Sequence, residues 1–303
     1  MVHAMSVLIV GSTALDSIRT PHGARDRLLG GSASYAAVAA SFFAPALMVG
    51  VVGGDFPTRY LSLFRRHGID LEGLQRRPGR TFHWAGEYES NMNRRRTLLT
   101  DLGVFAEFRP ELPERYRRSP FVLLGNIAPA LQLHVLRQLE KPRFVAADTM
   151  DLWIETARPE LLELLRRVDL FILNDTEAAQ LTGESNVVTA LRRLHALGPR
   201  FVIVKKGEHG AILSSRNGMF VAPAFPLARV VDPTGAGDSF AGALMGQLAR
   251  GRGPWESRLR HAIFYGSIVA SFCCEGFGLT RLDRIQLRDI EARAALLRRY
   301  TRV

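Results

Sequence analysis

The residues most suited to chemistry lie in the stretch VVDPTGAGDSFAGALMGQLARG, which begins at Val230. Three small residues, Gly235, Ala236 and Gly237, precede a run whose apolar spacing predicts a helix. The N-terminus of a helix carries unpaired backbone N–H groups and a positive dipole end, so a phosphate can bind there to the main chain alone. This stretch therefore predicts an anion hole at a helix N-terminus.

Asp238 follows in the first turn of the expected helix. Taken alone, it is an ordinary capping aspartate. Beside an anion hole, its carboxylate can also accept the proton of an attacking hydroxyl while the N–H groups stabilise charge on a transferred phosphoryl group. Both roles stay open from the residues alone, and the combination points to phosphoryl transfer.

The elements that must position these residues follow a regular alternation. Short apolar runs alternate with amphipathic segments such as 159–168, 187–197 and 254–272. Continuous apolar strands are typical of a mostly parallel sheet covered by helices on both faces, so we expect a doubly wound α/β fold. The predicted strands are VLIVG at Val7, LMVGVVG at Leu47, FVLLGN at Phe121, FVAAD at Phe144, LFILND at Leu170 and FVIVKKG at Phe201.

Two regions break this alternation. Residues of about 14–28 and 79–108 contain alternating apolar and polar stretches that predict half-buried antiparallel strands. We expect them to form a small β-sheet lid on a single domain of residues 1–303. Arg94, Arg95 and Arg96 fall in this lid, either as a solvated charged run or as groups that close over a phosphate.

Composition excludes several classes of protein. The formal net charge is +11, but the basic residues are spread along the chain without interleaved aromatics, so we expect no nucleic-acid partner. No apolar run is long enough to span a membrane, and we expect a cytoplasmic protein without a membrane partner. The two cysteines, Cys273 and Cys274, are adjacent, which argues against a disulfide or a zinc site.

The stretch DPTGAGDSFAGALMG resembles the C-terminal signature of the ribokinase-like (PfkB) carbohydrate and nucleoside kinases, which reads Asp-Thr-x-Gly-Ala-Gly-Asp before a helix. The stretch LLGGSASYAAVAASFFA, from Leu28, is similar to the N-terminal Gly-Gly signature of the same family. The resemblance extends from about Leu8 to Leu282. It implies a three-layer α/β/α sandwich with a β-sheet lid, ATP with Mg²⁺, activation by K⁺ in some members, and a homodimer formed through the lid.

The resemblance also implies roles for individual residues. Asp238 would be the catalytic base and Gly235, Ala236 and Gly237 the anion hole. The substrate-binding residues would be Asp16, Gly30, Gly31, Ser32 and Tyr35, where Tyr35 replaces an Asn that is frequent in the family. The nucleotide would contact Asn174, Lys205, Gly207, Gly210 and Thr234, and Asn174 with Glu177 would organise Mg²⁺ through water. A K⁺ site would lie between the loops at 230–232 and 275–278.

The function implied is transfer of the γ-phosphate of ATP to a hydroxyl of a sugar, an inositol-like polyol or a nucleoside. Phe82, Trp84 and Tyr88 either pack the lid or stack on a nucleobase, which would make the protein a nucleoside kinase specifically. A small-molecule binder without turnover on the same fold is the other alternative. A dinucleotide-binding oxidoreductase and a P-loop kinase are disfavoured, because the chain has neither G-x-G-x-x-G after its first strand nor G-x-x-x-x-G-K-[ST].

Overall fold

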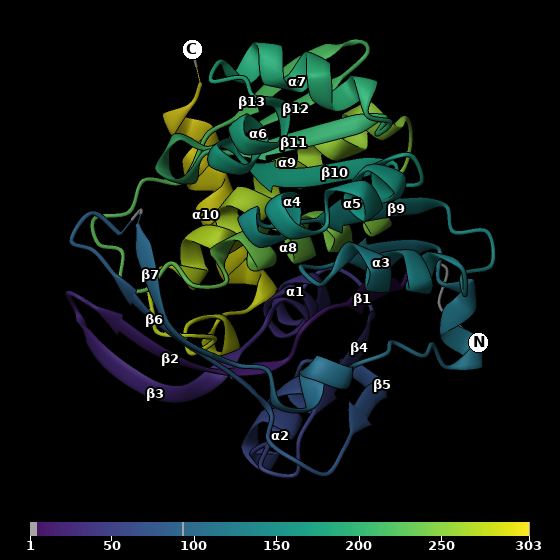
Figure 1. Ribbon diagram of the computed structural model, residues 1–303. Coiled ribbons are helices and arrows are strands. Elements are labelled where there is room, and N and C mark those ends of the chain that lie inside the picture. The colour runs from purple at the N-terminus through teal and green to yellow at the C-terminus, as the bar shows by residue number, and fades with distance from the viewer. Residues whose placement is uncertain (1–4, 93, 303) are drawn as a thin grey trace.

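The computed structural model describes residues 5–92 and 94–302, which form two sheets of different size (Figure 1). Within these residues the large sheet has the strand order β13-β12-β11-β10-β9-β8-β1-β4-β5, and the small sheet has the order β3-β2-β6-β7. The strands are β1 (Val7–Val10), β2 (Ala14–Thr20), β3 (Gly23–Gly30), β4 (Ala46–Val52), β5 (Asp70–Arg76), β6 (Phe82–Tyr88), β7 (Arg95–Asp101), β8 (Phe121–Leu124), β9 (Phe144–Asp148), β10 (Leu170–Asn174), β11 (Phe201–Lys205), β12 (Ala211–Ser215) and β13 (Gly218–Ala222). The helices are α1 (Ser32–Ser41), α2 (Thr58–Arg66), α3 (Pro129–Leu136), α4 (Asp151–Thr156), α5 (Arg158–Leu165), α6 (Asp175–Thr182), α7 (Val187–Ala196), α8 (Ala236–Arg250), α9 (Trp255–Cys273) and α10 (Leu287–Tyr300), with 3₁₀ turns η1 (Gly103–Glu107), η2 (Glu114–Arg118), η3 (Gly207–His209) and η4 (Leu282–Arg284).

The large sheet is mostly parallel. β11, β10, β9, β8, β1, β4 and β5 run in one direction, and β12 and β13 extend one side as an antiparallel hairpin. Short apolar strands buried on both faces form such a sheet because helices cover both sides. The predicted α/β fold is confirmed, and the carboxyl ends of the parallel strands meet at one edge, where ligands bind in folds of this class.

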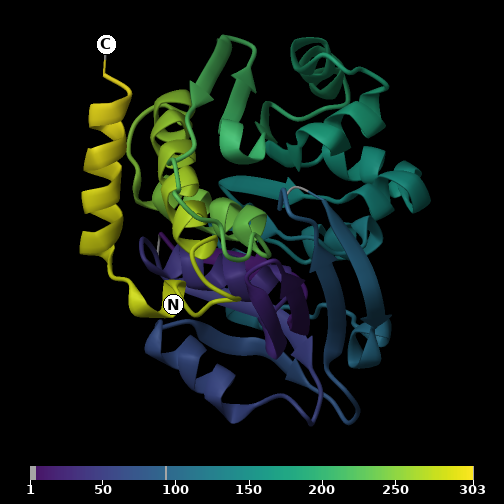
Figure 2. The same ribbon diagram turned by 90° about the vertical axis from the view of Figure 1, so that its left-hand side faces the viewer.

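Helices cover the two faces of the large sheet and complete the three predicted layers (Figure 2). Alternate strand residues point to opposite faces. Ile9 and Ile172 join the core beneath α1, α8, α9 and α10, whereas Leu8 and Phe171 join the core beneath α3, α4, α5, α6 and α7.

Close packing of α1 against α8 brings two glycine-rich stretches together. A Cβ atom on Gly242 would collide with the backbone of Ala36, and one on Gly246 would lie 2.7 Å from the carbonyl oxygen of Ala40. Only residues without a side chain allow this approach. The N-termini of α1 and α8 therefore lie side by side at the carboxyl edge of the large sheet.

The small sheet is built from the two regions that break the alternation of the sequence, and it lies at the lower left of Figure 1. β3 pairs with β2, and β7 with β6, in antiparallel fashion as predicted. β2 and β6, however, run parallel, with Leu15 opposite His83, so the prediction of antiparallel strands is wrong for this pair. The reason is that β2 follows β1 in the chain and β6 follows β5. Since β1 and β5 run in the same direction in the large sheet, β2 and β6 enter the small sheet in the same direction.

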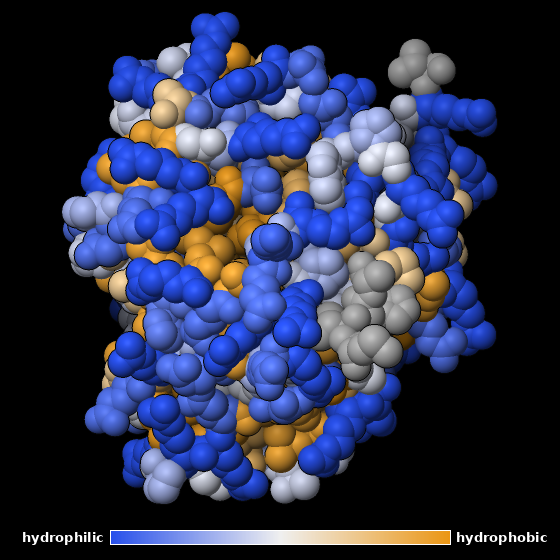
Figure 3. Space-filling model, turned by 90° about the vertical axis from the view of Figure 1, so that its right-hand side faces the viewer, coloured by the Kyte–Doolittle hydropathy of each residue, from blue (hydrophilic) through white to orange (hydrophobic). Residues whose placement is uncertain are grey.

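The surface away from the small sheet is mainly hydrophilic, with hydrophobic residues visible in gaps between hydrophilic ones (Figure 3). Exposed leucines occur on the small sheet, where Leu98 and Leu99 belong to β7 and Leu102 follows it. Among the described residues, no helix has the length and apolar character needed to cross a membrane.

Candidate active site

The first turn of α8 forms the centre of the site. Gly235 precedes the helix with φ of 75°, and a Cβ atom there would collide with the ring of Tyr35. Glycine adopts this left-handed conformation without strain, so the chain can turn into the helix while the Tyr35 ring lies directly behind it. The predicted helix N-terminus at Gly235, Ala236 and Gly237 is thus present, with the positive end of α8 directed out of the packed core.

Asp238 lies in this first turn and is half-buried. Burial, together with the nearby carboxylate of Asp148, raises its pKa from 3.8 to about 6, although the charges of Lys205 and Arg95 oppose the shift. A carboxyl with a pKa close to neutrality is suited to take a proton and release it again. This property fits a base better than a simple helix cap.

Asp16 faces the same space from the small sheet. It is 4% exposed, lies across Gly30 so closely that a Cβ atom on this glycine would collide with its carboxylate, and accepts a hydrogen bond from the backbone of Gly31. Burial raises the pKa of Asp16 from 3.8 to about 8, with further contributions from the charges of Asp232 and Asp238. Two carboxyl groups, one from the small sheet and one from the first turn of α8, therefore lie close together at the N-terminus of this helix.

The Gly-Gly stretch holds this arrangement in place. Gly31 has φ of 90°, and a Cβ atom there would lie 2.5 Å from the carbonyl oxygen of Ser12. The Ser32 hydroxyl accepts a hydrogen bond from the backbone N–H of Ser12 at 3.1 Å, and the Ser32 N–H donates to the Ser12 hydroxyl at 3.0 Å. Ser32 thus ties the start of α1 to the loop after β1.

Tyr35 connects the two signatures. Its side chain is 1% exposed, and its ring fills the space behind Gly235. Within the part of the chain that the structure describes, the Tyr35 hydroxyl has no hydrogen-bond partner, and Asp16 and Asp232 are close enough to raise its pKa after burial, the largest cause. The hydroxyl is therefore an unsatisfied polar group next to the two carboxylates.

Lys205 reaches the anion hole from the end of β11. Its Nζ atom pairs with a carboxylate oxygen of Asp148 at 3.1 Å, and a Cβ atom on Gly237 would lie 3.1 Å from the same nitrogen. Burial lowers the pKa of Lys205, but the charges of Asp148, Glu177 and Asp238 together raise it above its usual value, so the amine is protonated at neutral pH. Asp148 was not singled out from the sequence, although a carboxylate at the end of the apolar strand FVAAD is a visible signal.

Asn174 and Glu177 form a capping box at the start of α6. The Asn174 side chain accepts a hydrogen bond from the Glu177 N–H at 2.7 Å, and one Glu177 oxygen accepts from the Asn174 N–H at 2.8 Å. Burial raises the pKa of Glu177 to about 7, with Lys205 lowering it and Asp148 raising it. Glu177 therefore belongs to the charged cluster around Lys205, and its second oxygen is not used by the cap.

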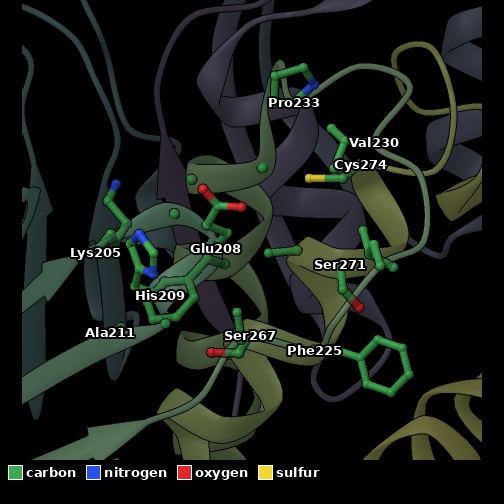
Figure 4. Close-up of a pocket in the computed structure, with 18 of the residues that line it drawn as sticks. Lys205, Glu208, His209, Ala211, Phe225, Val230, Pro233, Ser267, Ser271 and Cys274 are labelled. Carbon is green, nitrogen blue, oxygen red and sulfur yellow. The ribbon is translucent and has the colours of Figure 1, made fainter. Parts of the chain in front are cut away.

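A cavity of about 520 Å³ opens beside Lys205 and the anion hole (Figure 4). The predicted residues Lys205, Gly207, Gly210, Ala236 and Gly237 line it, whereas Asn174 and Thr234 do not. The apolar wall of this cavity was not predicted, because it comes from chain segments far apart in the sequence. The wall includes Phe225, Val230, Phe240, Ala270 and Cys274.

The small sheet touches the site through Tyr88. The hydroxyl groups of Tyr88 and Thr234 are hydrogen-bonded at 3.1 Å, so Thr234 faces the small sheet. The other two aromatic residues singled out in this region have different surroundings: Phe82 stacks on Phe105 at 5.4 Å, and Trp84 lies beneath the guanidinium of Arg95. Phe82 therefore packs the structure, and Tyr88 is the aromatic residue that contacts the anion-hole loop.

Comparison with known proteins agrees with this geometry. Residues 6–284 match the model of the pfkB family carbohydrate kinases. A cytidine kinase of Thermococcus kodakarensis is 30% identical over 264 residues, which cover 84% of this chain and 92% of the relative. An aminoimidazole riboside kinase of Salmonella typhimurium is 26% identical over 291 residues, which cover 90% of this chain and 89% of the relative.

Solved structures show the same fold. The nucleoside kinase of Methanocaldococcus jannaschii has a TM-score of 0.78 at 20% identity and covers 96% of this chain and 98% of its own. That of Burkholderia thailandensis, in complex with inosine, has a TM-score of 0.79 at 20% identity and covers 96% and 97%. With a family model spanning nearly all of its 303 residues, this chain belongs to the pfkB family of carbohydrate kinases, which are phosphotransferases.

Proposed function

We propose that this kinase transfers the γ-phosphate of ATP to a ribose hydroxyl of a nucleoside. The observation that carries the proposal is the arrangement around the N-terminus of α8. Asp238 lies in the first turn of this helix, Asp16 lies nearby on the small sheet, and a cavity lined by Lys205 opens beside it. A helix N-terminus with a neighbouring base and a cation has the parts that phosphoryl transfer requires. The cavity would hold the donor, and the space between the carboxylates the acceptor.

The residues have separate roles in this mechanism. Asp16 would orient the acceptor hydroxyl, and Asp238 would take its proton as the acceptor oxygen bonds to the γ-phosphorus and the bond to the leaving ADP oxygen breaks. The backbone of Gly235–Gly237 would stabilise charge on the phosphoryl group in transit. Lys205 would add a positive charge on the donor side, and the unsatisfied Tyr35 hydroxyl would be free to contact the acceptor.

Magnesium would bind mainly through phosphate oxygens and water. Among the described residues, no group of three His, Cys, Asp or Glu side chains could hold a metal by itself, and the free oxygen of Glu177 lies in the Lys205 cluster. Such a site fits Mg²⁺, which keeps several waters and binds few protein ligands. The ion would neutralise charge on the transferred phosphate.

Potassium would bind next to Asp232. This residue is 0% exposed, and its two oxygens accept hydrogen bonds from the N–H groups of Thr234 and Gly278 at 2.9 and 3.0 Å. The carboxylate thus connects the loops at 230–232 and 275–278, and within the described ranges no Lys or Arg pairs with it. A buried charge without a counter-ion favours a cation at this place.

The choice of a nucleoside acceptor is supported by the relatives that match most of the chain, since they act on cytidine and on aminoimidazole riboside. Ribokinase and fructokinase also match, but over 54% and 39% of the chain. Because ATP is the donor, the reaction would take place in the cytoplasm.

The experiment is a phosphotransfer screen of the purified protein with ATP and Mg²⁺, in K⁺ or Na⁺ buffer. Cytidine, adenosine, inosine, ribose, fructose and myo-inositol serve as acceptors, and both ADP and the phosphorylated product are measured. We expect a nucleoside monophosphate, formed faster in K⁺ than in Na⁺. A product from a free sugar or inositol alone would replace the nucleoside proposal, and no product from a folded protein that binds ATP would favour the binder without turnover.

A homodimer through the small sheet is the arrangement we propose for the protein in solution. β7 forms one edge of this sheet and carries Leu98 and Leu99, which are 44% and 45% exposed. An open strand edge with apolar side chains is a template for pairing with a second copy. Light scattering during size exclusion should give the mass of a dimer, and replacing both leucines by lysine should give a monomer; a monomeric wild-type protein would contradict this arrangement.

A further inference from the structure

The three consecutive arginines before and within β7 are not equivalent. In the pairing of β6 with β7, Arg95 lies opposite Tyr88 and Arg96 lies opposite Glu87. Neighbouring strand residues point to opposite faces of a sheet, so Arg95 and Arg96 face different environments. Arg96 is 75% exposed and forms an ion pair with Glu87 at 2.8 Å on the outer face. Arg95 shares the face of Tyr88, which is directed to the anion-hole loop.

Contacts hold the Arg95 guanidinium at this place. It lies over the Trp84 ring at 5.5 Å from the ring centroid and donates a hydrogen bond to the Tyr88 hydroxyl. The same hydroxyl is 3.1 Å from the hydroxyl oxygen of Thr234, the residue before Gly235. The Arg95 guanidinium thus links Trp84 to Tyr88, and the Tyr88 hydroxyl continues this chain of contacts to the start of α8.

The charge of Arg95 acts on the reaction centre. Among the described residues it forms no ion pair with a carboxylate, yet its positive charge lowers the pKa of both Asp16 and Asp238. Lys205 lies on the other side of the α8 N-terminus, where Asp148 already neutralises much of its charge. The small sheet therefore supplies the positive charge that has no carboxylate partner.

We propose that Arg95 is a catalytic residue of the phosphoryl transfer, and that its guanidinium binds the oxygens of the phosphoryl group as this moves from ATP to the acceptor. The inference rests on the proposed function and extends it. Guanidinium groups match phosphate oxygens in geometry and remain charged at all relevant pH values. The carboxyl groups of Asp16 and Asp238 are close enough for the charge of Arg95 to act on both, and a cation without a carboxylate partner at this place can stabilise negative charge on the phosphoryl group in transit.

The proposal gives the small sheet a chemical role in addition to covering the site. The contact between Tyr88 and Thr234 holds the small sheet, and Arg95 with it, next to the start of α8.

The test compares Arg95→Ala, Arg95→Lys and the control Arg96→Ala in the full-length protein. Cytidine serves as the acceptor, or the most active member of the screened panel. We expect Arg95→Ala to lower kcat about 100- to 1000-fold, because an arginine acting on a transferred phosphoryl group contributes at least this much. The KM for ATP should stay within about 2-fold, Arg95→Lys should recover part of the rate, and Arg96→Ala should match the wild type within about 2-fold.

A binding measurement tests the same idea without turnover. Isothermal titration with ADP and Mg²⁺, with and without aluminium fluoride as a mimic of the phosphoryl group in transit, should show tighter binding with the mimic in the wild type. Arg95→Ala should bind ADP alone as the wild type does and lose most of this gain.

The outcomes are distinguishable. A wild type that does not bind ADP overturns the proposed function, and the role of Arg95 with it. A wild type that binds ADP but gains nothing from aluminium fluoride, or an Arg95→Ala variant with the kcat of Arg96→Ala, overturns the role of Arg95 alone. A raised KM for the acceptor at unchanged kcat would show that Arg95 binds the acceptor instead.

Discussion

The two sheets of this kinase differ in how far their strands are exposed to solvent. Every residue of β1, β4, β8 and β9 is buried, whereas β7 is exposed along almost its entire length. Buried strands fix the positions of side chains at their ends, and exposed strands with few buried contacts open at lower cost in free energy. The large sheet and the helices packed on it therefore hold Lys205, Asp238 and the donor cavity on a rigid frame, and the small sheet brings Asp16 and Tyr88 to it.

The largest loss of activity is expected from replacement of Asp238, which belongs to the rigid frame formed by the large sheet and its helices. Because Asn cannot accept the proton, Asp238→Asn should lower kcat by roughly 10³-fold, within the range for loss of a general base. The thermal midpoint and the affinity for ADP should change little. Asp289→Asn, which alters the first turn of α10 away from the site, should lose a helix cap without losing activity. Near-wild-type activity of Asp238→Asn would remove Asp238 as the base.

Substitution of Gly235 tests how tightly the start of α8 is packed against Tyr35. Gly235 and Gly183 have almost the same backbone conformation, with φ of 75° and 74°, but a Cβ atom has nothing within 4 Å at Gly183 and collides with Tyr35 at Gly235. Gly183→Ala should cost about 1 kcal/mol of stability from the backbone alone. Gly235→Ala should cost more and should also reduce activity about 100-fold, because the anion hole is displaced. Equal losses of stability in urea denaturation would show that the Tyr35 contact is not restrictive.

The pH dependence of kcat/KM tests whether the small sheet acts electrostatically on the base in α8. The base form of Asp238 is lost as the pH falls through its pKa of about 6, so kcat/KM should fall tenfold for each pH unit below this value. Asp16 and Asp238 interact, and the observed pKa belongs to the pair. Since Arg95 lowers the pKa of both carboxyls, Arg95→Ala should shift the acidic limb to higher pH. A profile from pH 4.5 to 9 measures both effects, and an unchanged limb in this variant would mean that the small sheet does not act electrostatically on the base.

The smallest expected effect concerns the contact between the sheets. Tyr88→Phe removes the hydroxyl that bonds to Thr234, which is worth about 1 kcal/mol, so kcat/KM should fall about 5-fold while overall stability stays nearly the same. Tyr60→Phe is the control, because the Tyr60 hydroxyl also ties α2 to the small sheet, through the carbonyl oxygen of Arg27, but does so away from α8. If the two variants lose the same activity, the Thr234 contact has no particular role.

Local sequence patterns predicted much of the fold. The apolar runs that became β1, β8, β9, β10 and β11 were recognisable because strands buried on both faces need uninterrupted apolar residues. β5 was not recognised, since Asp70–Arg76 mixes charged and apolar residues without a continuous apolar run, and only Gly73 in it is fully buried. The parallel pairing of β2 and β6 was also missed, because it depends on where two distant strands leave the large sheet.

The candidate site divides in the same way. Gly235, Asp238, Lys205 and Gly207 stand in short stretches with a recognisable pattern, and the structure brings them together at one edge. Asp148 was overlooked although it ends a recognisable apolar strand, whereas the apolar wall around Phe225 and Cys274 had no pattern of its own. A cavity wall assembled from several helices and loops requires only apolar residues of suitable size, and these occur throughout the chain.

The sequence by itself determined the mostly parallel sheet, the helix N-terminus at Gly235 and the carboxylate in its first turn, because each depends on neighbouring residues and on backbone geometry. Only the tertiary structure decided that Asp16 and Asp238 share one buried space, that Tyr35 lies behind Gly235, and that Arg95 instead of Arg96 faces the reaction centre. The physical reason is that burial, charge coupling and strand register arise from contacts between segments far apart in the chain, which no local pattern specifies.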